Sequence, residues 1–129
     1  MPGFQTITMY RTPCYGRCPV YRLELNNQGL FSYFPIRFTP RTDTFTLTLS
    51  VESRRHVSRR INKLKFKSLH HEYPHANEPV PQDLPSIILT FQEFGEPDTI
   101  TIRGAMGEGL PSELSAFINY LDSLWLKVP

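Results

Sequence analysis

Apolar and polar residues alternate along most of the first 49 positions of the chain. Ile7 and Met9 alternate with threonines, and Leu23 and Leu25 alternate with charged residues. A period of two is typical of strands that bury one face and expose the other to water. The pattern therefore predicts four strands, over residues 4–10, 20–25, 30–34 and 42–49, with a hairpin turn at the polar segment between the second and third.

A helical period replaces this alternation after residue 49. Ser50 can cap the start of a helix that runs to about Leu64. Its apolar stripe consists of Val57, Ile61 and Leu64, at positions i, i+4 and i+7. The stripe is narrow, so this helix is expected to bury one edge and to leave most of its circumference in water.

The second half of the chain predicts two more strands and a second helix. Residues 70–85 are rich in proline and predict a loop, and strands follow at 86–91 and 99–103. The helix spans about 111–125 and presents a full amphipathic stripe to the core, formed by Leu114, Phe117, Ile118, Leu121 and Trp125.

The order of elements is thus β-β-β-β-α-β-β-α. Neighbouring strands without a regular β-α alternation favour an α+β fold, with a mainly antiparallel sheet of about six strands and both helices packed on one face. A length of 129 residues is that of one domain, so residues 1–129 are expected to form a single unit.

Composition limits where such a protein can work. No apolar run approaches the ~18 residues of a membrane helix. The first ten residues lack the basic flank and apolar core of a signal peptide. The sequence as given therefore predicts a cytoplasmic protein with no membrane partner.

The net charge of +2 conceals a strong asymmetry. Residues 1–67 carry 12 Lys and Arg against 3 Asp and Glu, a charge of +9, whereas residues 68–129 carry 2 against 9, a charge of −7. Seven of the 14 basic residues fall within positions 54–67. A helix of this kind can dock on an acidic protein, which includes the acidic half of a second copy of the chain. It can instead bind nucleic acid or another polyanion, or its charged face can simply be solvated. The candidate binding residues are Arg54, Arg55, Arg59, Arg60 and Lys63.

The segment Arg11 to Tyr21, RTPCYGRCPVY, contains both cysteines of the chain. In a tight turn at Gly16, Cys14 and Cys18 could reach the Cα separation of 4.4–6.8 Å that a disulfide needs. Three uses remain open: a structural pair, a thiol-reactive or redox site that nearby arginines would activate, and a metal site.

Other candidate chemistry is sparse. His70, His71 and His75 lie in the proline-rich segment, and the spacing of the last two matches that of some zinc ligands, but no second cysteine pair accompanies them. The chain lacks G-x-S-x-G, H-E-x-x-H and P-loop motifs. We therefore expect no metal or other cofactor and favour a non-enzymatic interaction module. The alternatives are a redox protein that uses Cys14 and Cys18, and a polyanion binder that uses the basic helix.

The cysteine segment resembles the motif T-x-C-(aromatic)-G-x-C-P-x-Y of a bacterial domain family of unknown function, DUF6438. The matching residues are Thr12, Cys14, Tyr15, Gly16, Cys18, Pro19 and Tyr21. The later order of helix, strand and terminal helix is also similar, although Gln28–Gly29 stands where relatives usually have Asp-Gly. The resemblance supports the predicted fold and implies no particular activity.

Overall fold

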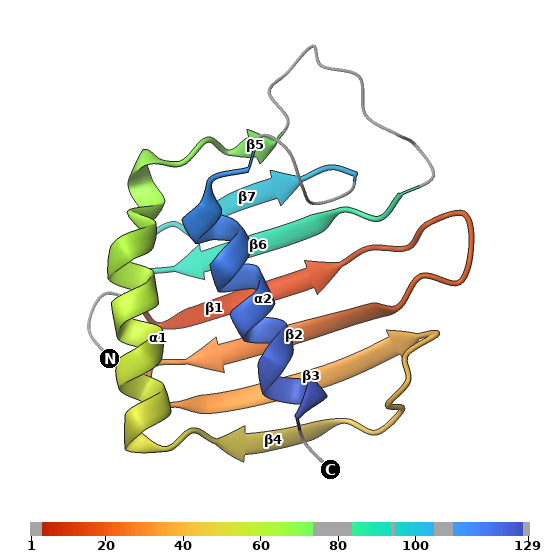
Figure 1. The fold of residues 1–129 in the computed structure, drawn as a ribbon, viewed down its shortest axis with the longest axis horizontal. Helices are drawn as coiled ribbons and strands as arrows, with labels where there is room; N and C mark the ends of the chain where they lie inside the picture. Colours follow the sequence, from red (N-terminus) through yellow and green to blue (C-terminus); the bar gives the residue numbers. More distant parts are fainter. Residues whose placement is uncertain (1–3, 74–83, 94, 105–109, 128–129) are drawn as a thin grey trace.

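A seven-stranded sheet forms the centre of the described part of the molecule (Figure 1). The computed structural model describes residues 4–73, 84–93, 95–104 and 110–127. The strand order is β4-β3-β2-β1-β6-β7-β5. The strands are β1 (Thr6–Arg11), β2 (Val20–Asn26), β3 (Leu30–Arg37), β4 (Phe45–Thr48), β5 (Glu72–Tyr73), β6 (Ile87–Gln92) and β7 (Asp98–Ile102).

The N-terminal strand β1 lies in the middle of the sheet. It pairs antiparallel with β2 on one side and with β6 on the other, so that Ile7 lies opposite both Leu25 and Phe91. Ile7 and Met9 are buried, whereas Thr6, Thr8 and Tyr10 are partly exposed. The alternation read from the sequence therefore correctly assigns the two faces of the strand.

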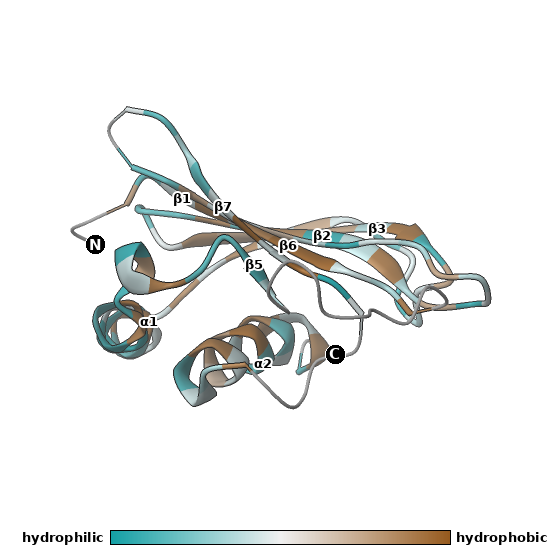
Figure 2. Ribbon diagram, turned by 90° about the horizontal axis from the view of Figure 1, so that it is seen from above, coloured by the Kyte–Doolittle hydropathy of each residue, from teal (hydrophilic) through white to brown (hydrophobic). Residues whose placement is uncertain are grey.

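Both helices cover the same face of the sheet, as Figure 2 shows from the side. Helix α1 (Val51–Leu64) begins at Ser50, whose Oγ accepts a hydrogen bond of 3.1 Å from the backbone N–H of Ser53. It ends at Lys65, which adopts a left-handed conformation with φ of 48°. Helix α2 (Ser112–Leu126) runs diagonally across the strands, and its predicted apolar stripe is buried throughout.

The fold class is confirmed: the protein is α+β, its sheet is mostly antiparallel, and two helices pack on one face. The sheet has one strand more than expected, since β5 lies within the segment predicted as loop. This two-residue strand pairs parallel with β7. Two residues are too few to show a period, and β5 is held by backbone bonds, such as that from the N–H of Arg103 to the carbonyl of Tyr73 at 2.7 Å. Within the described residues, no helix is both long and apolar enough to cross a membrane.

Candidate functional site

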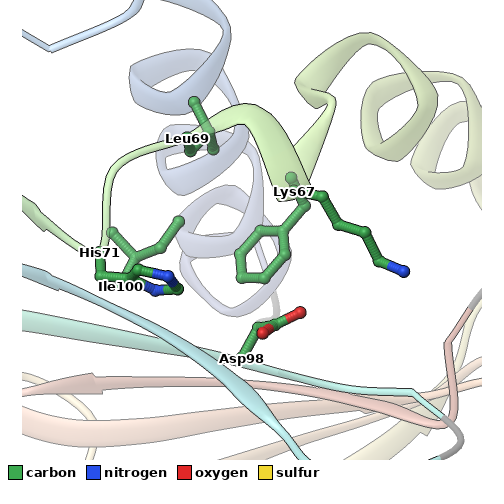
Figure 3. A pocket seen from close by; sticks show the side chains of 6 residues that line it. Lys67, Leu69, His71, Asp98 and Ile100 are labelled. Carbon is green, nitrogen blue, oxygen red and sulfur yellow. The ribbon is translucent and has the colours of Figure 1, made fainter.

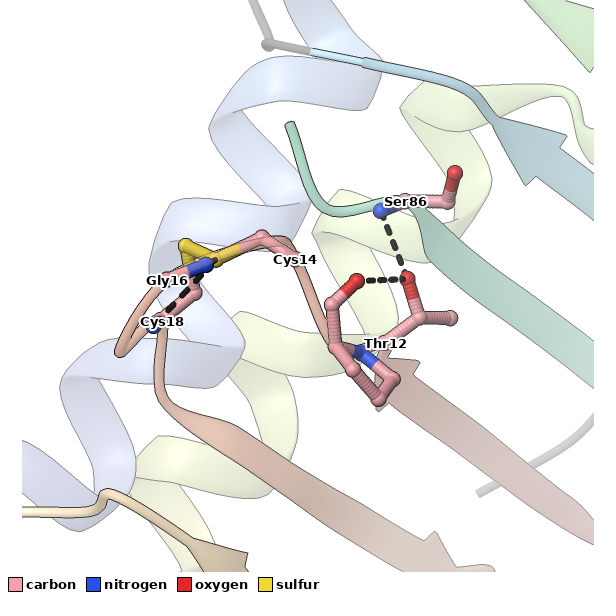
Figure 4. Close-up of a disulfide and its surroundings, with 6 residues drawn as sticks. Thr12, Cys14, Gly16, Cys18 and Ser86 are labelled. Carbon is pink, nitrogen blue, oxygen red and sulfur yellow. Dashed lines mark hydrogen bonds between the residues drawn. A yellow bond between two sulfur atoms is a disulfide. The ribbon is translucent and has the colours of Figure 1, made fainter. Parts of the chain in front are cut away.

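The connection between β1 and β2, residues 12–19, is a closed turn that we call the corner (Figure 4). Cys14 and Cys18 form a disulfide, with their Cα atoms 5.8 Å apart. The backbone N–H groups of Gly16 and Cys18 point at the Cys14 sulfur, at 3.2 and 3.3 Å. The expectation that the two sulfurs are close enough to pair is thus confirmed.

The turn does not depend on the conformational freedom that a glycine would give at position 16. Its φ is not positive, and a Cβ added there would lie 3.9 Å from the sulfur of Cys14, an ordinary contact. The disulfide and not a glycine conformation therefore closes the turn.

Thr12 fastens the first limb of the corner to β6. Its backbone N–H donates to the carbonyl of Ser86 at 2.9 Å, and its Oγ1 accepts from the N–H of Ser86 at 2.8 Å. This pair of bonds continues the ladder between β1 and β6 by one step beyond Arg11 and Ile87. The threonine of the cysteine motif therefore has a structural role.

A polar network joins the base of the corner to α2. Asp122 accepts hydrogen bonds from the hydroxyl of Tyr21 at 2.6 Å, from Nη2 of Arg11 at 3.0 Å and from Nε1 of Trp125 at 3.1 Å. Arg11 Nε also donates to the Tyr21 hydroxyl at 2.9 Å. The side chains of Arg11 and Asp122 are only 17% and 14% exposed. We call these four residues the Asp122 network.

The Asp122 network changes the acidity of Tyr21. Burial and, after it, the negative charge of Asp122 raise the pKa of the Tyr21 phenol well above its usual value, and the nearby Arg11 offsets this only in part. The phenol therefore remains a hydrogen-bond donor throughout the physiological range. The tyrosine of the motif anchors the corner and does not serve as a base.

The tip of the corner contrasts with its anchored base. Tyr15 is 82% exposed and makes no hydrogen bond or ring contact with the described residues, and Pro19 is exposed as well. Arg17 lies over the ring of Phe38, with its guanidinium carbon 5.8 Å from the ring centroid. The corner thus holds Tyr15 outward on a fixed support.

The basic residues of α1 divide into two groups. Arg55, Arg59 and Lys63 are exposed and form no ion pair with any described residue. Arg54 instead packs against Gly29, and its Nε donates to the carbonyl of Leu49 at 3.3 Å. Helical spacing predicts that Arg55, Arg59 and Lys63 point away from the apolar stripe, and their exposure agrees with this prediction.

Arg60 helps to form a small hollow between the two helices, which we call the α1–α2 pocket. The pocket has a volume of about 160 Å³ and is lined by His56, Arg59, Arg60, Lys63 and Glu113. Arg60 Nε donates to His56 Nε2 at 2.7 Å, and both groups lie against the ring of Tyr120 on α2. Burial and the positive charges of Arg60, Arg59 and Lys63 lower the pKa of His56. The pocket therefore brings together three cationic side chains, a histidine with a lowered pKa and the carboxylate of Glu113.

The histidines singled out as metal candidates do not form a site in the described structure. His71 Nδ1 lies 3.3 Å from the carbonyl oxygen of Thr99, and the ring of His70 packs edge-on against Tyr73. His75 lies outside the described residues. Among the residues that are described, no group of three or more His, Cys, Asp or Glu side chains could hold a metal ion.

A second hollow, of about 260 Å³, lies beside the 3₁₀ turn η1 (Phe66–Ser68) that follows α1 (Figure 3). Phe66 reaches across it to the sheet, where its ring centroid is 3.7 Å from that of Phe91. The other lining residues are Lys67, Leu69, His71, Asp98 and Ile100. The lining thus mixes single charged and polar side chains with aliphatic and aromatic groups.

The described structure therefore combines an α+β fold with a disulfide-closed turn, whose base is anchored to α2, and a helix with exposed cations that form no described ion pair. The family described as "Domain of unknown function (DUF6438)" matches residues 5–125, and the chain belongs to that family. A search of curated proteins finds no match. The family resemblance of the sequence is confirmed, and it adds no activity to the structural description.

Proposed function

We propose that this protein is a non-enzymatic binding module whose helix α1 docks on an acidic surface of another protein. The observation that carries the proposal is the row formed by Arg55, Arg59 and Lys63, which face solvent at helical spacing without any described ion pair. Exposed charge pairs contribute only ~0–1 kcal/mol to folding, whereas complementary charge controls encounter and register between proteins. The cations are therefore better suited to association than to stability.

The α1–α2 pocket gives this surface a defined point of attachment. Arg59, Arg60 and Lys63 supply N–H donors around a hollow that has room for one carboxylate side chain. Glu113 also lines the pocket and limits the positive charge there. A partner that inserts one carboxylate and spreads others along α1 would match both features.

A charge-reversed variant tests the proposal. Replacing Arg55, Arg59 and Lys63 together by Glu should leave the melting temperature nearly unchanged and abolish binding to a fluorescent glutamate decapeptide, measured by anisotropy at low salt. The matched control carries the same charge change on exposed cations elsewhere, at Arg22, Lys67 and Lys127. Equal binding of the decapeptide by both variants would refute the proposal.

Two further measurements separate the alternatives. Tighter, salt-dependent binding to duplex DNA or heparin than to the decapeptide would assign α1 to a polyanion instead. A dimer at low salt that dissociates at high salt, and that the α1 reversal removes, would assign it to a second copy of the chain.

His56 provides a direct signal from the pocket. A carboxylate bound beside His56 opposes the positive charges that depress its pKa, so binding should raise that pKa. Proton uptake and binding are then coupled, and affinity should increase as the pH falls through the histidine range. An NMR titration of the His56 ring with and without the decapeptide measures the shift, and an unchanged pKa would place the peptide outside the pocket.

A further inference from the structure

Three large apolar side chains are exposed at the end of the sheet that carries the corner. Tyr15 is 82% exposed, Ile36 59% and Phe38 47%. The corner and the end of β3 lie together at the end of the sheet opposite α1 (Figure 1). Arg17 and Arg37 place their guanidinium groups 5.8 and 5.4 Å from the ring centroid of Phe38, which joins the two segments. We call these five residues the corner patch.

The support beneath Tyr15 is far more elaborate than an exposed turn needs. The disulfide closes the turn, Thr12 fastens one limb to Ser86, and the Asp122 network fastens the base to α2. A turn whose backbone is already rigid loses less conformational entropy when it binds a partner than a flexible loop does. The supports that stabilise the fold therefore also meet a requirement of recognition, a rigid backbone beneath an exposed aromatic side chain.

The backbone of Phe38 gives an independent indication that the corner patch is a functional surface. Its φ is 58°, in the left-handed region that glycine and asparagine adopt readily and that a bulky residue rarely occupies. A buried aromatic ring could justify such strain by its packing, but this ring is about half exposed. Backbone strain of this kind concentrates at functional sites. In this conformation the ring of Phe38 lies beside Arg17 and Arg37, next to the corner.

The charge of the corner patch identifies the chemistry of its occupant. Arg17 and Arg37 form no ion pair with the described residues, whereas Arg22 on the same strand pair reaches Glu24 at 3.8 Å. Tyrosine and arginine, together with tryptophan, are enriched among the residues that dominate binding at the centres of protein interfaces. Two cations without a described ion pair, both beside the half-exposed ring of Phe38, match a protein segment that alternates carboxylates with apolar side chains.

We propose that the corner patch is a second docking site, which binds an acidic, extended segment of a partner protein. Tyr15 and Phe38 cover apolar side chains of that segment, and Arg17 and Arg37 pair with its carboxylates. An aromatic ring flanked by two guanidinium groups, as at Phe38, suits a shaped protein surface better than a lipid bilayer, into which side chains insert freely. The site is separate from α1 and does not depend on the function proposed for that helix.

A selection from a library of random 12-residue peptides displayed on phage tests this proposal. Peptides are selected on the wild-type protein and depleted on a Tyr15→Ser/Phe38→Asn variant. The expected result is enrichment of Asp and Glu at alternate positions. A synthetic, fluorescent copy of the selected peptide should then bind at least tenfold more weakly to Tyr15→Ser, and also to an Arg17→Glu/Arg37→Glu variant.

Two controls keep the result specific. Val51 is 63% exposed on α1, so Val51→Ser removes an exposed apolar side chain far from the corner and should not change binding. Reversal of Arg55, Arg59 and Lys63 should also leave binding of the selected peptide intact, which distinguishes this site from the one on α1. Circular dichroism melting confirms that each variant is folded.

Other outcomes would overturn the proposal. Selected peptides without acidic residues, or equal binding by wild type and Tyr15→Ser, would show that the corner patch has no such partner. Binding to vesicles of phosphatidylcholine and phosphatidylserine that Tyr15→Ser abolishes, without peptide binding, would assign the patch to a membrane surface. A dimer that dissociates in Tyr15→Ser would assign it to a second copy of the chain.

Discussion

Asp122 offers the sharpest test of how the corner is held. Its carboxylate accepts hydrogen bonds from Tyr21, Arg11 and Trp125 and is mostly shielded from water. The substitution Asp122→Asn keeps the size of the side chain and one carbonyl acceptor but removes the negative charge. It also directs an N–H₂ group at donors that need an acceptor. Asp122→Ala removes the whole acceptor.

The expected loss of unfolding free energy depends on which hydrogen-bonding and charged groups each variant leaves unpaired. A hydrogen bond to a charged group contributes ~1.5–3 kcal/mol, and breaking a buried ion pair costs ~3–5 kcal/mol. Because both charged side chains retain some exposure, solvent reduces the second figure. We expect Asp122→Asn to lower the free energy of unfolding by about 2 kcal/mol and Asp122→Ala by about 3 kcal/mol.

Urea unfolding followed by tryptophan fluorescence measures both values, since Trp125 is itself part of the network. The matched control is Glu24→Gln, because Glu24 pairs with Arg22 on the surface, with side chains 38% and 44% exposed. That variant should change stability by less than about 0.5 kcal/mol. An Asp122→Asn variant as stable as Glu24→Gln would show that the Asp122 network does not hold the corner.

Four other predictions concern the same structure. Because the raised pKa of Tyr21 lets the folded protein keep a proton that the unfolded chain loses near pH 10, stability should fall as the pH rises above about 10. Urea unfolding at several pH values should show a smaller fall for Tyr21→Phe. Replacing Cys14 and Cys18 by Ser should lower the free energy of unfolding by about 2 kcal/mol, and a reductant should have no further effect on that variant. Leu121→Ala should cost about 2–5 kcal/mol in chemical denaturation, because Leu121 is buried against the sheet, and a smaller loss would place α2 outside the core. Phe38→Asn should change the free energy of unfolding by less than about 1 kcal/mol, because relief of the left-handed backbone strain offsets the lost contacts with arginine. A larger loss in thermal or chemical denaturation would show that Phe38 is needed for folding.

The fold was predictable because its strands and helices repeat a simple period. The alternation around Ile7 and the stripe through Leu121 each extend over enough residues to identify both the element and its buried face. The strand β5 was not predictable, because its two residues pair through the backbone and leave no pattern of side chains. The cysteine pair was predictable as a close contact, since sequence spacing and the limits of disulfide geometry constrain it.

The Asp122 network could not be predicted from the sequence. Arg11 and Tyr21 precede Asp122 by 111 and 101 residues, and the packing of α2 on the sheet brings them together. One signal was available: Asp122 lies beside the apolar stripe, one turn before Trp125, where a carboxylate needs a partner. The corner patch was missed for a different reason. Phe38 falls between the strands predicted at 30–34 and 42–49, and nothing in the sequence of that segment indicates its left-handed conformation.

The central place of β1 has a consequence for how the chain folds during synthesis. Its first neighbour, β2, follows within about ten residues, and β2, β3 and β4 can then add in turn by local pairing. Its second neighbour, β6, begins only at Ile87, 76 residues after Arg11. At a synthesis rate of about 5–20 residues per second, β1 stays an unpaired edge for roughly 4–15 s. Closing so long a segment is slow, and an exposed edge can pair with other chains. The N-terminal half of the sheet must therefore remain monomeric on its own until the C-terminal half has been made.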